Sequence, residues 1–245
     1  KDVDSVSGNP DIFANELSLY VEDDWMLSSR LKVNMGVHDA GFWVQDNCYR
    51  SLQPRFTGRY LFPGQWSIKA SYASMMQFIH LLSNSNVGLP TDLWVPATRR
   101  VKPQQSYQGA IGLAKGVKAN TYEISLEGYY KHMKDIIDYL DGANFIGGSN
   151  DWEDKVAQGT GWSYGAELLI QKKKGKYTGW IGYTLSWTNR QFAEINDGKI
   201  YPYKYDRRHD ISIVNLYKFS NKLDIGVTWV YGTGNAVSLP LQSYL

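Results

Sequence analysis

The feature that most constrains the fold of this sequence is a sustained two-residue alternation, which is clearest in residues 120–132. One face of that segment is apolar and carries Tyr122, Ile124, Leu126, Gly128 and Tyr130. The intervening positions are polar or charged, with Tyr129 as the exception. Because successive side chains of a β-strand point to opposite faces, the segment predicts a strand with one apolar and one polar face.

The same alternation recurs along the chain in roughly ten segments of about ten to thirteen residues each. Their alternating cores lie at 17–25, 31–37, 55–62, 66–78, 107–113, 122–130, 163–171, 177–187, 211–217 and 223–231. Soluble sandwiches and propellers also alternate, but their strands usually have about five or six residues. A tilted strand that crosses a membrane needs about nine to eleven. Segment length therefore favours a transmembrane sheet.

The connections between these segments alternate between short and long. Turn signals occur at 28–29, 63–65, 116–120, 173–176 and 220–221, and longer irregular stretches occur at 39–51, 79–103, 141–158 and 189–205. In an up-and-down meander this order places the tight turns at one end of the sheet and the long loops at the other.

Aromatic residues are abundant, with nine Trp and eighteen Tyr, and their spacing fits a membrane. Tyr122 and Tyr130 share a face and would lie roughly 26 Å apart at about 3.3 Å per residue. Aromatic girdles flank a lipid-facing band about 25 Å tall in outer-membrane barrels. The residues expected to join these girdles are Trp25, Trp66, Tyr177, Trp187, Trp229 and Tyr231. The fold class predicted is all-β, an antiparallel up-and-down transmembrane β-barrel with a hydrated lumen.

Composition excludes several other classes of protein. With 26 basic and 24 acidic residues, the chain lacks the bulk charge of a nucleic-acid binder. The single cysteine, Cys48, rules out an intramolecular disulfide framework and a four-cysteine zinc site. The four histidines lack metal-ligand spacing and no GxSxG motif occurs, so we expect no metal, no cofactor and no enzymatic activity.

Several phrases resemble the C-terminal barrel region of TonB-dependent outer-membrane receptors. They are LSLYVEDDW (17–25), QPRFTGRY (53–60), GWSYGAELLIQKKKGKYTGWIGYTLSW (161–187), YPYKYDRRHDISIV (201–214) and GVTWVYGTG (226–234). The resemblance implies a plugged barrel of about 22 strands. Residues 1–245 would then be one partial barrel domain of about ten strands, with the plug domain and the closing C-terminal strands outside it, so we expect a processed chain or a fragment.

The resemblance implies active uptake across the outer membrane of a Gram-negative cell, coupled to the TonB complex. The ligand would be scarce, such as an iron-siderophore, a cobalamin-like cofactor or an oligosaccharide. Further partners implied are outer-membrane lipid, the protein's own plug domain and a surface lipoprotein, whose presence stays open. A passive porin or adhesin-like barrel is one alternative, and a soluble carbohydrate-binding β domain is another.

Aromatic residues of the expected loops are the best candidates for ligand contact, because they have no core to enter and can stack on sugars or apolar ligands. They are Trp94, Trp152, Tyr201 and Tyr203. The alternative for each is packing between loops. No catalytic residue is predicted.

The densest charged cluster is DRRHD at 206–210. Arg207, Arg208 and His209 could contact an anionic ligand or the plug, because a guanidinium is a forked donor suited to carboxylates and phosphates. The alternative, which we favour, is a rim network in which the acids neutralise the arginines. The acids expected on the lumen face should pair with Lys32 and Lys69 or face the plug, and they are Glu123, Glu127, Glu167 and Asp224.

Overall fold

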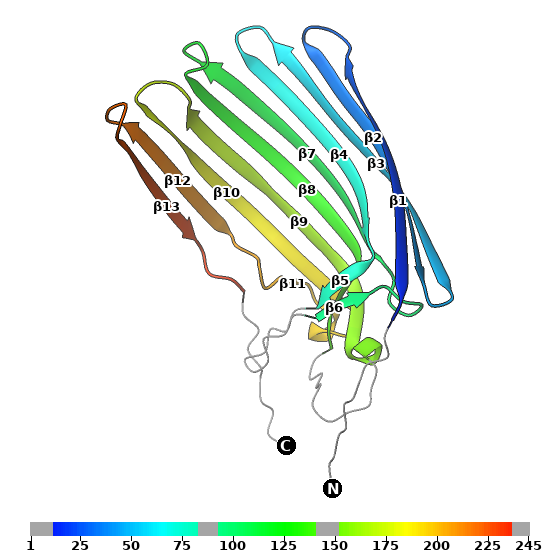
Figure 1. Cartoon of the computed structure of the whole chain (residues 1–245). Helices are drawn as coiled ribbons and strands as arrows, with labels where there is room; N and C mark the ends of the chain where they lie inside the picture. The colour runs from blue at the N-terminus through cyan, green and yellow to red at the C-terminus, as the bar shows by residue number, and fades with distance from the viewer. Residues whose placement is uncertain (1–11, 83–92, 141–151, 237–245) are drawn as a thin grey trace, which may run out of the picture.

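The computed structural model describes residues 12–82, 93–140 and 152–236, which form one long, curved antiparallel sheet (Figure 1). Its eleven strands are β1 (Ala14–Met26), β2 (Leu31–Val44), β3 (Asn47–Phe62), β4 (Trp66–Gln77), β7 (Gln104–Val117), β8 (Tyr122–Tyr139), β9 (Val156–Lys172), β10 (Tyr177–Phe192), β11 (Tyr201–Pro202), β12 (His209–Lys218) and β13 (Asp224–Gly232). The described helices are the short 3₁₀ turns η1 (Trp152–Lys155) and η2 (Asn196–Gly198). None of them is long and apolar enough to cross a membrane.

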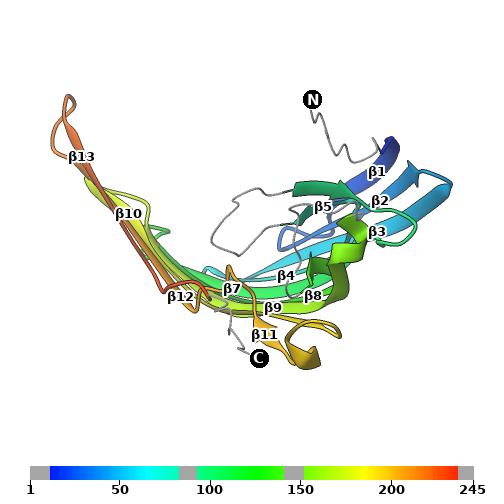
Figure 2. The same ribbon diagram turned by 90° about the horizontal axis from the view of Figure 1, so that it is seen from below.

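The main strands lie side by side in their order along the chain, β1-β2-β3-β4-β7-β8-β9-β10-β12-β13, and every pair is antiparallel. They correspond one by one to the ten segments expected from the alternation, so the up-and-down meander is confirmed. Seen from below, the sheet bends into a trough (Figure 2). Within the described residues β1 and β13 remain at its two edges, so the sheet is the wall of an unclosed barrel.

The two ends of the sheet differ as the connection pattern predicts, except at the connection between β2 and β3. Tight turns join strands at the upper end in Figure 1, which we call the turn end. The other connections, the tight turn between β2 and β3 among them, lie at the opposite, loop end. Residues 83–92 and 141–151, parts of two predicted loops, lie outside the described residues. A separate two-stranded sheet, β5 (Ile79–Leu82) and β6 (Leu93–Pro96), stands at the loop end on the concave side (Figures 1 and 2).

The prediction of a long loop at 39–51 is wrong. β2 continues to Val44, β3 begins at Asn47, and Gln45 takes the positive φ of 52° in the tight turn between them. The end of β2 carries apolar residues on both faces, because Phe42 points inward and Trp43 outward. The two-residue alternation of apolar and polar side chains is therefore not visible there. Phe42 stacks on Phe78 with 4.9 Å between ring centroids. The chain beyond β4 therefore folds inward and covers this hairpin, which a reading of the local sequence does not show.

The convex and concave faces of the sheet differ in chemistry. On the convex face of β8, Ile124 and Leu126 are 42% and 55% exposed. Leu126 lies directly between Leu113 of β7 and Leu168 of β9, so the apolar ridge continues across strands. Glu123, Ser125 and Glu127 lie on the opposite, concave face of this segment, so the faces deduced from the alternation of residues 120–132 are confirmed.

Aromatic side chains lie at two levels of the convex face. At the turn end, Lys115 Nζ lies 4.4 Å from the ring centroid of Trp66, and Lys172 Nζ lies 5.7 Å from that of Tyr122. At the other level, Tyr164 stacks on Trp187 with 5.4 Å between centroids. Lysines that extend their stems along aromatic rings are typical of the boundary between hydrocarbon and headgroups.

A lysine placed midway between the two aromatic levels tests which face meets lipid. In the full-length protein, Leu126→Lys should destabilise the protein folded in lipid vesicles by about 2–4 kcal/mol, which is the cost of Lys at the bilayer midplane. Ser125→Lys, one residue away on the concave face, is the matched control and should change it little. Urea titration of vesicle-inserted protein measures both, and equal effects of the two substitutions would contradict the assignment of the faces.

Candidate functional site

The loop end of the sheet holds three packed clusters of buried apolar residues. One of them joins β5, β6, β8 and η1 through Leu82, Val95, Val101, Ile137 and Trp152. Trp152 is only 4% exposed. Its ring packs between loops, which is the alternative to ligand contact for this residue. Trp94 faces away from this cluster and is 63% exposed.

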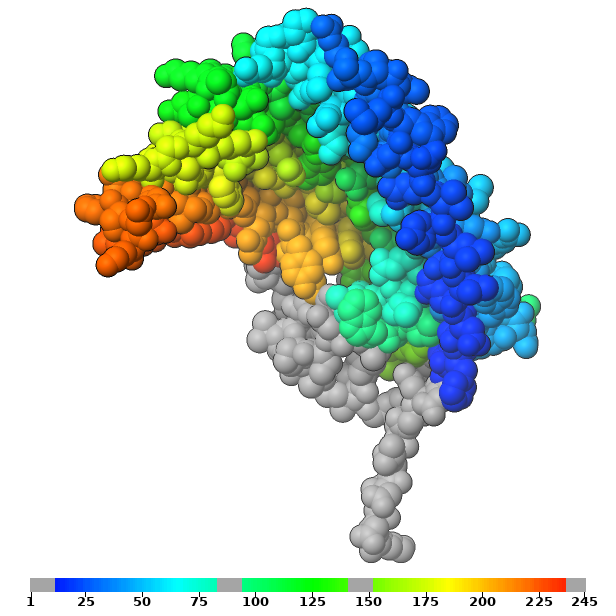
Figure 3. Space-filling model, turned by 45° about the horizontal axis from the view of Figure 1, so that its top comes forward, coloured from blue at the N-terminus to red at the C-terminus, as the bar shows by residue number. Residues whose placement is uncertain are grey.

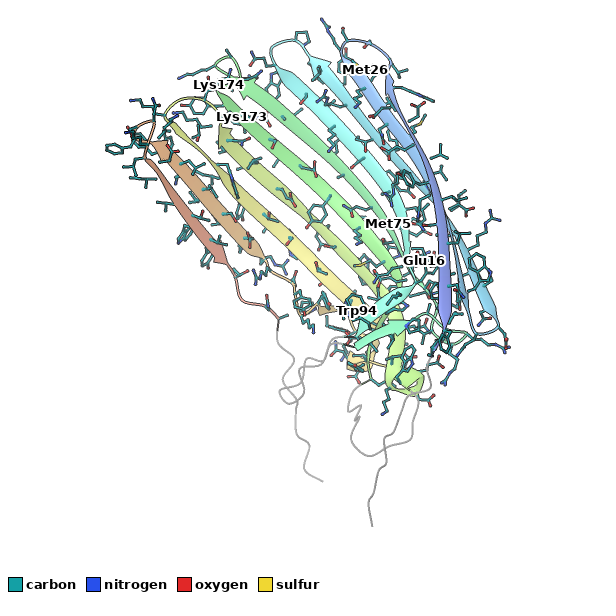
Figure 4. The ribbon with its side chains drawn as sticks, in the orientation of Figure 1. Glu16, Met26, Met75, Trp94, Lys173 and Lys174 are labelled. Carbon is teal, nitrogen blue, oxygen red and sulfur yellow. The ribbon has the colours of Figure 1, made fainter. Side chains whose placement is uncertain are left out.

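The surroundings of Trp94 make it the better candidate for ligand contact. It lies on β6 on the concave side of the sheet (Figure 4). The register places Glu16 of β1 and Met75 of β4 on the same concave face, and Figure 4 shows both toward the loop end. In the space-filling view the molecule is hollowed on this side (Figure 3). An exposed indole at the mouth of a trough can stack on a ligand without unfolding its support.

Tyr201 and Tyr203 are brought together by a polar network that the sequence analysis missed. Arg190 of β10 bonds to Asp138 of β8 with an Nη1 to Oδ2 distance of 3.2 Å. The Tyr201 hydroxyl donates to the same Oδ2 over 3.3 Å, and the Arg190 guanidinium carbon lies 3.4 Å from the ring centroid of Tyr203. Asp138 and Arg190 are 52 residues apart in sequence, so local patterns gave no signal for their pairing.

The cluster at 206–210 is held by ion pairs and hydrogen bonds of its own residues. Asp206 is 8% exposed, accepts the backbone N–H of Thr188 over 2.7 Å, and pairs with Arg208 over 3.0 Å. Arg207 Nη1 lies 3.9 Å from Asp210 Oδ2. His209 Nδ1 lies 2.8 Å from the Tyr183 hydroxyl. These contacts attach the start of β12 to β10, and a role in ligand or plug contact stays a prediction.

Three cations share one row of the concave wall near the turn end. Lys32 lies opposite Arg59, and Arg59 lies opposite Lys69, on β2, β3 and β4. They line a hollow of about 410 Å³ together with Asp24, Asn34 and Thr57. Lys32 bonds to Asp24 over 3.1 Å, whereas no ion pair of Arg59 or Lys69 occurs among the described residues. Like charges directly opposite each other destabilise a sheet unless something neutralises them.

The acids of the concave wall lie further along the sheet. Glu127 of β8 stands directly opposite Glu167 of β9. Glu123 bonds to Lys173 over 2.6 Å, so the expected pairing of these acids with Lys32 and Lys69 does not form in the described part of the chain. The inner wall is thus cationic on β2 to β4 and acidic on β8 and β9.

A buried histidine lies in the β5–β6 unit. His80 is 1% exposed, and within the described structure neither ring nitrogen has a hydrogen-bond partner. Burial lowers the pKa of His80 to about 4. The ring is therefore neutral at pH 7.

Metal binding gains no support from the described residues, where no group of three or more His, Cys, Asp or Glu side chains is placed to hold an ion. The arrangement at the loop end instead offers an exposed indole, two tyrosines and an ion-paired arginine. Such groups bind by stacking and charge-assisted hydrogen bonds.

The comparisons with known proteins agree with this two-faced wall. Residues 2–244 match the family described as TonB dependent receptor-like, beta-barrel, and the chain belongs to that family. No curated protein sequence matches the chain.

Solved structures with the same fold include three transporters or receptors. The FrpB iron transporter from Neisseria meningitidis superposes with a TM-score of 0.63 at 14% identity, over 88% of this chain and 32% of that one. The ferripyoverdine receptor of the outer membrane of Pseudomonas aeruginosa gives 0.59 at 13%, over 92% and 32%. The RagAB peptide transporter gives 0.51 at 10%, over 87% and 30%. This chain therefore spans about a third of these proteins' length.

Protonation of His80 should loosen the β5–β6 unit in acid. Its folded pKa of about 4 lies below the unfolded value of 6.5, so the unfolded segment binds more protons between these pH values. Stability is therefore complete above about pH 6.5 and falls as pH is lowered toward 4, by about 3 kcal/mol in all.

Amide exchange of β5 and β6, corrected for its intrinsic pH dependence, measures this loss. His80→Leu should abolish the dependence, whereas His132→Gln on the outer wall should leave it unchanged. Identical profiles in wild type and His80→Leu would contradict the assignment.

The two loop tryptophans should differ in their effect on local stability. Trp152→Ala removes a buried ring and should cost about 3–5 kcal/mol in the opening free energy of the packed loops, whereas Trp94→Ala should cost less than about 0.5 kcal/mol. Amide exchange at Val95 and Ile137 reports both. A similar loss in the two variants would show that Trp94 also holds the loops together.

Proposed function

We propose that this chain is part of the barrel of a TonB-dependent importer in the Gram-negative outer membrane, and that the transported ligand is an iron chelate. The observation that carries the proposal is the family match over residues 2–244 on a sheet with a lipid-compatible outer face and a polar inner face. An iron transporter and a ferripyoverdine receptor are among the structures with the same fold, which supports this ligand class. An oligosaccharide or cobalamin-like ligand would use the same aromatic groups.

In this proposal the loop end captures the ligand and the lumen passes it on. Trp94 offers an exposed ring on the concave side, and Arg190 holds Tyr203 in place through its own bond to Asp138. In this mechanism no covalent bond is made or broken, so no side chain needs a shifted pKa. High affinity from the loops suits a ligand that is scarce outside the cell.

The inner wall supports a partner inside the barrel. Glu127 and Glu167 face each other without an ion pair among the described residues, and opposed carboxylates favour a cation from the barrel centre. We propose that basic groups of the plug domain provide it, and that energy from the TonB complex breaks these contacts to open the lumen. A passive porin would leave this acidic pair facing water.

Uptake of a radiolabelled iron chelate tests the proposal. Cells that express the full-length protein under iron limitation should accumulate the label only when the TonB complex is intact. Accumulation that is independent of TonB would support the porin instead. Absence of uptake across a panel of ferric siderophores would exclude an iron chelate as the ligand.

Trp94→Ala should weaken binding of the chelate about three- to tenfold, the loss expected for one aromatic stacking contact. Trp43→Ala is the matched control, because that ring is also exposed but lies on the outer face of the wall. Binding to whole cells measures both variants. Equal affinities of the Trp94→Ala and Trp43→Ala variants for the chelate would show that Trp94 does not contact the ligand. They would not contradict the proposed class of transporter.

A further inference from the structure

The outer wall contains a hollow that the proposed transport does not use. Its volume is about 660 Å³, and it spreads over β4, β7, β8, β9 and β10. The side chains that face outward along it belong to Ile111, Tyr130, Tyr164, Ala166 and Trp187. It lies at the level of the aromatic residues nearer the loop end.

Small residues on neighbouring strands create the hollow. Gly128 of β8 is paired directly with Ala166 of β9, and Gly109 of β7 is paired with Tyr130. A Cβ atom added to Gly128 or to Gly109 would meet no other atom closer than 3.9 Å. The floor of the hollow is therefore bare backbone, and a side chain could be added there without a clash.

The rim of the hollow is rigid and aromatic. Tyr130 and Tyr164 are cross-strand partners, and Tyr164 stacks on Trp187 with planes only 13° apart. On its other side the Trp187 ring meets the guanidinium of Arg208, whose central carbon lies 4.6 Å from the ring centroid. Interlocked rings of this kind hold a fixed shape with little rotamer freedom.

A cation lies beyond the hollow toward the loop end, on β8. Lys134 of β8 faces outward and is exposed, four residues beyond Tyr130, or about 13 Å along the strand. Its Nζ lies 5.9 Å from the ring centroid of Tyr107, and it has no ion pair among the described residues. Its ammonium group thus stands where headgroups begin if the aromatic rows mark the membrane boundary.

We propose that this hollow is a binding site for one phosphorylated membrane lipid, with an acyl chain on the Gly128 and Ala166 floor and a phosphate near Lys134. The inference rests on the proposed placement in a membrane. The occupant follows from the position of the hollow, because the exposed Leu126 and Ile111 beside it make this the hydrocarbon-facing side. An apolar floor, an aromatic rim and a free ammonium together match an acyl chain joined to an anionic headgroup.

Filling the floor of the hollow tests the site. Gly128→Leu in the full-length protein displaces about two methylene groups of the lipid, and each buried methylene changes a binding constant about fourfold. We therefore expect roughly fifteenfold less lipid to remain bound after washing in mild detergent, as measured by mass spectrometry of extracted lipid per protein. Lys134→Gln should reduce retention of phosphorylated lipids and spare neutral ones.

Gly58→Leu is the matched control. This glycine also faces outward, and an added Cβ would meet only Phe56 at 3.5 Å, but it lies outside the hollow. It should retain lipid as the wild type does. Heat-modifiable migration on gels reports folding, and Ala166→Leu replaces Gly128→Leu if the latter does not fold.

If the Gly128→Leu variant retains as much lipid as the wild type, the site is overturned. It is also overturned if the wild-type protein retains no lipid, or if a second protein occupies the hollow. A failure of the proposed transport is seen separately. Such a protein would still be recovered from the outer-membrane fraction and would bind lipid, but it would not accumulate an iron chelate.

Discussion

Continuous pairing of backbone hydrogen bonds from strand to strand is the constraint on which the rest of this structure depends. In hydrocarbon an unpaired N–H or C=O costs several kcal/mol, so each lipid-facing strand must match its neighbour without a gap. The ladder between β8 and β9 runs in register from Tyr122 to Lys134, and its one irregularity falls between Lys134 and Ile136, near the loop end. A shift of one residue would exchange the two faces of the wall.

That register also organises the charges of the inner wall. It brings Lys32, Arg59 and Lys69 into one row and sets Glu127 against Glu167 in the continuation of that row. Like charges brought together in this way are unfavourable in an empty lumen. The polar face is therefore divided into a cationic part on β2 to β4 and an acidic part on β8 and β9.

At the loop end a different kind of packing takes over. There the strands extend beyond the aromatic levels, and the β5–β6 unit folds inward onto the concave face and buries Phe42, Phe78 and Trp152. This small core leaves Trp94 exposed, and a separate cluster of Ile136, Ala157, Phe192 and Ile195 packs against the Tyr201 that bonds to Asp138. The wall supplies stability, and the inward fold supplies the positions of the candidate ligand contacts.

The sequence by itself determined the ten main strands, their two faces and the tight turns of the turn end, because side-chain parity and turn chemistry are local properties. Only the tertiary structure decided that residues 39–51 form a hairpin, that Trp152 is buried while Trp94 is exposed, and that Arg190 meets Asp138. Each of these depends on contacts between segments far apart in the chain, such as Phe42 with Phe78. The same holds for the hollow over Gly128, since a glycine in a strand shows a site only when its neighbours on adjacent strands are known.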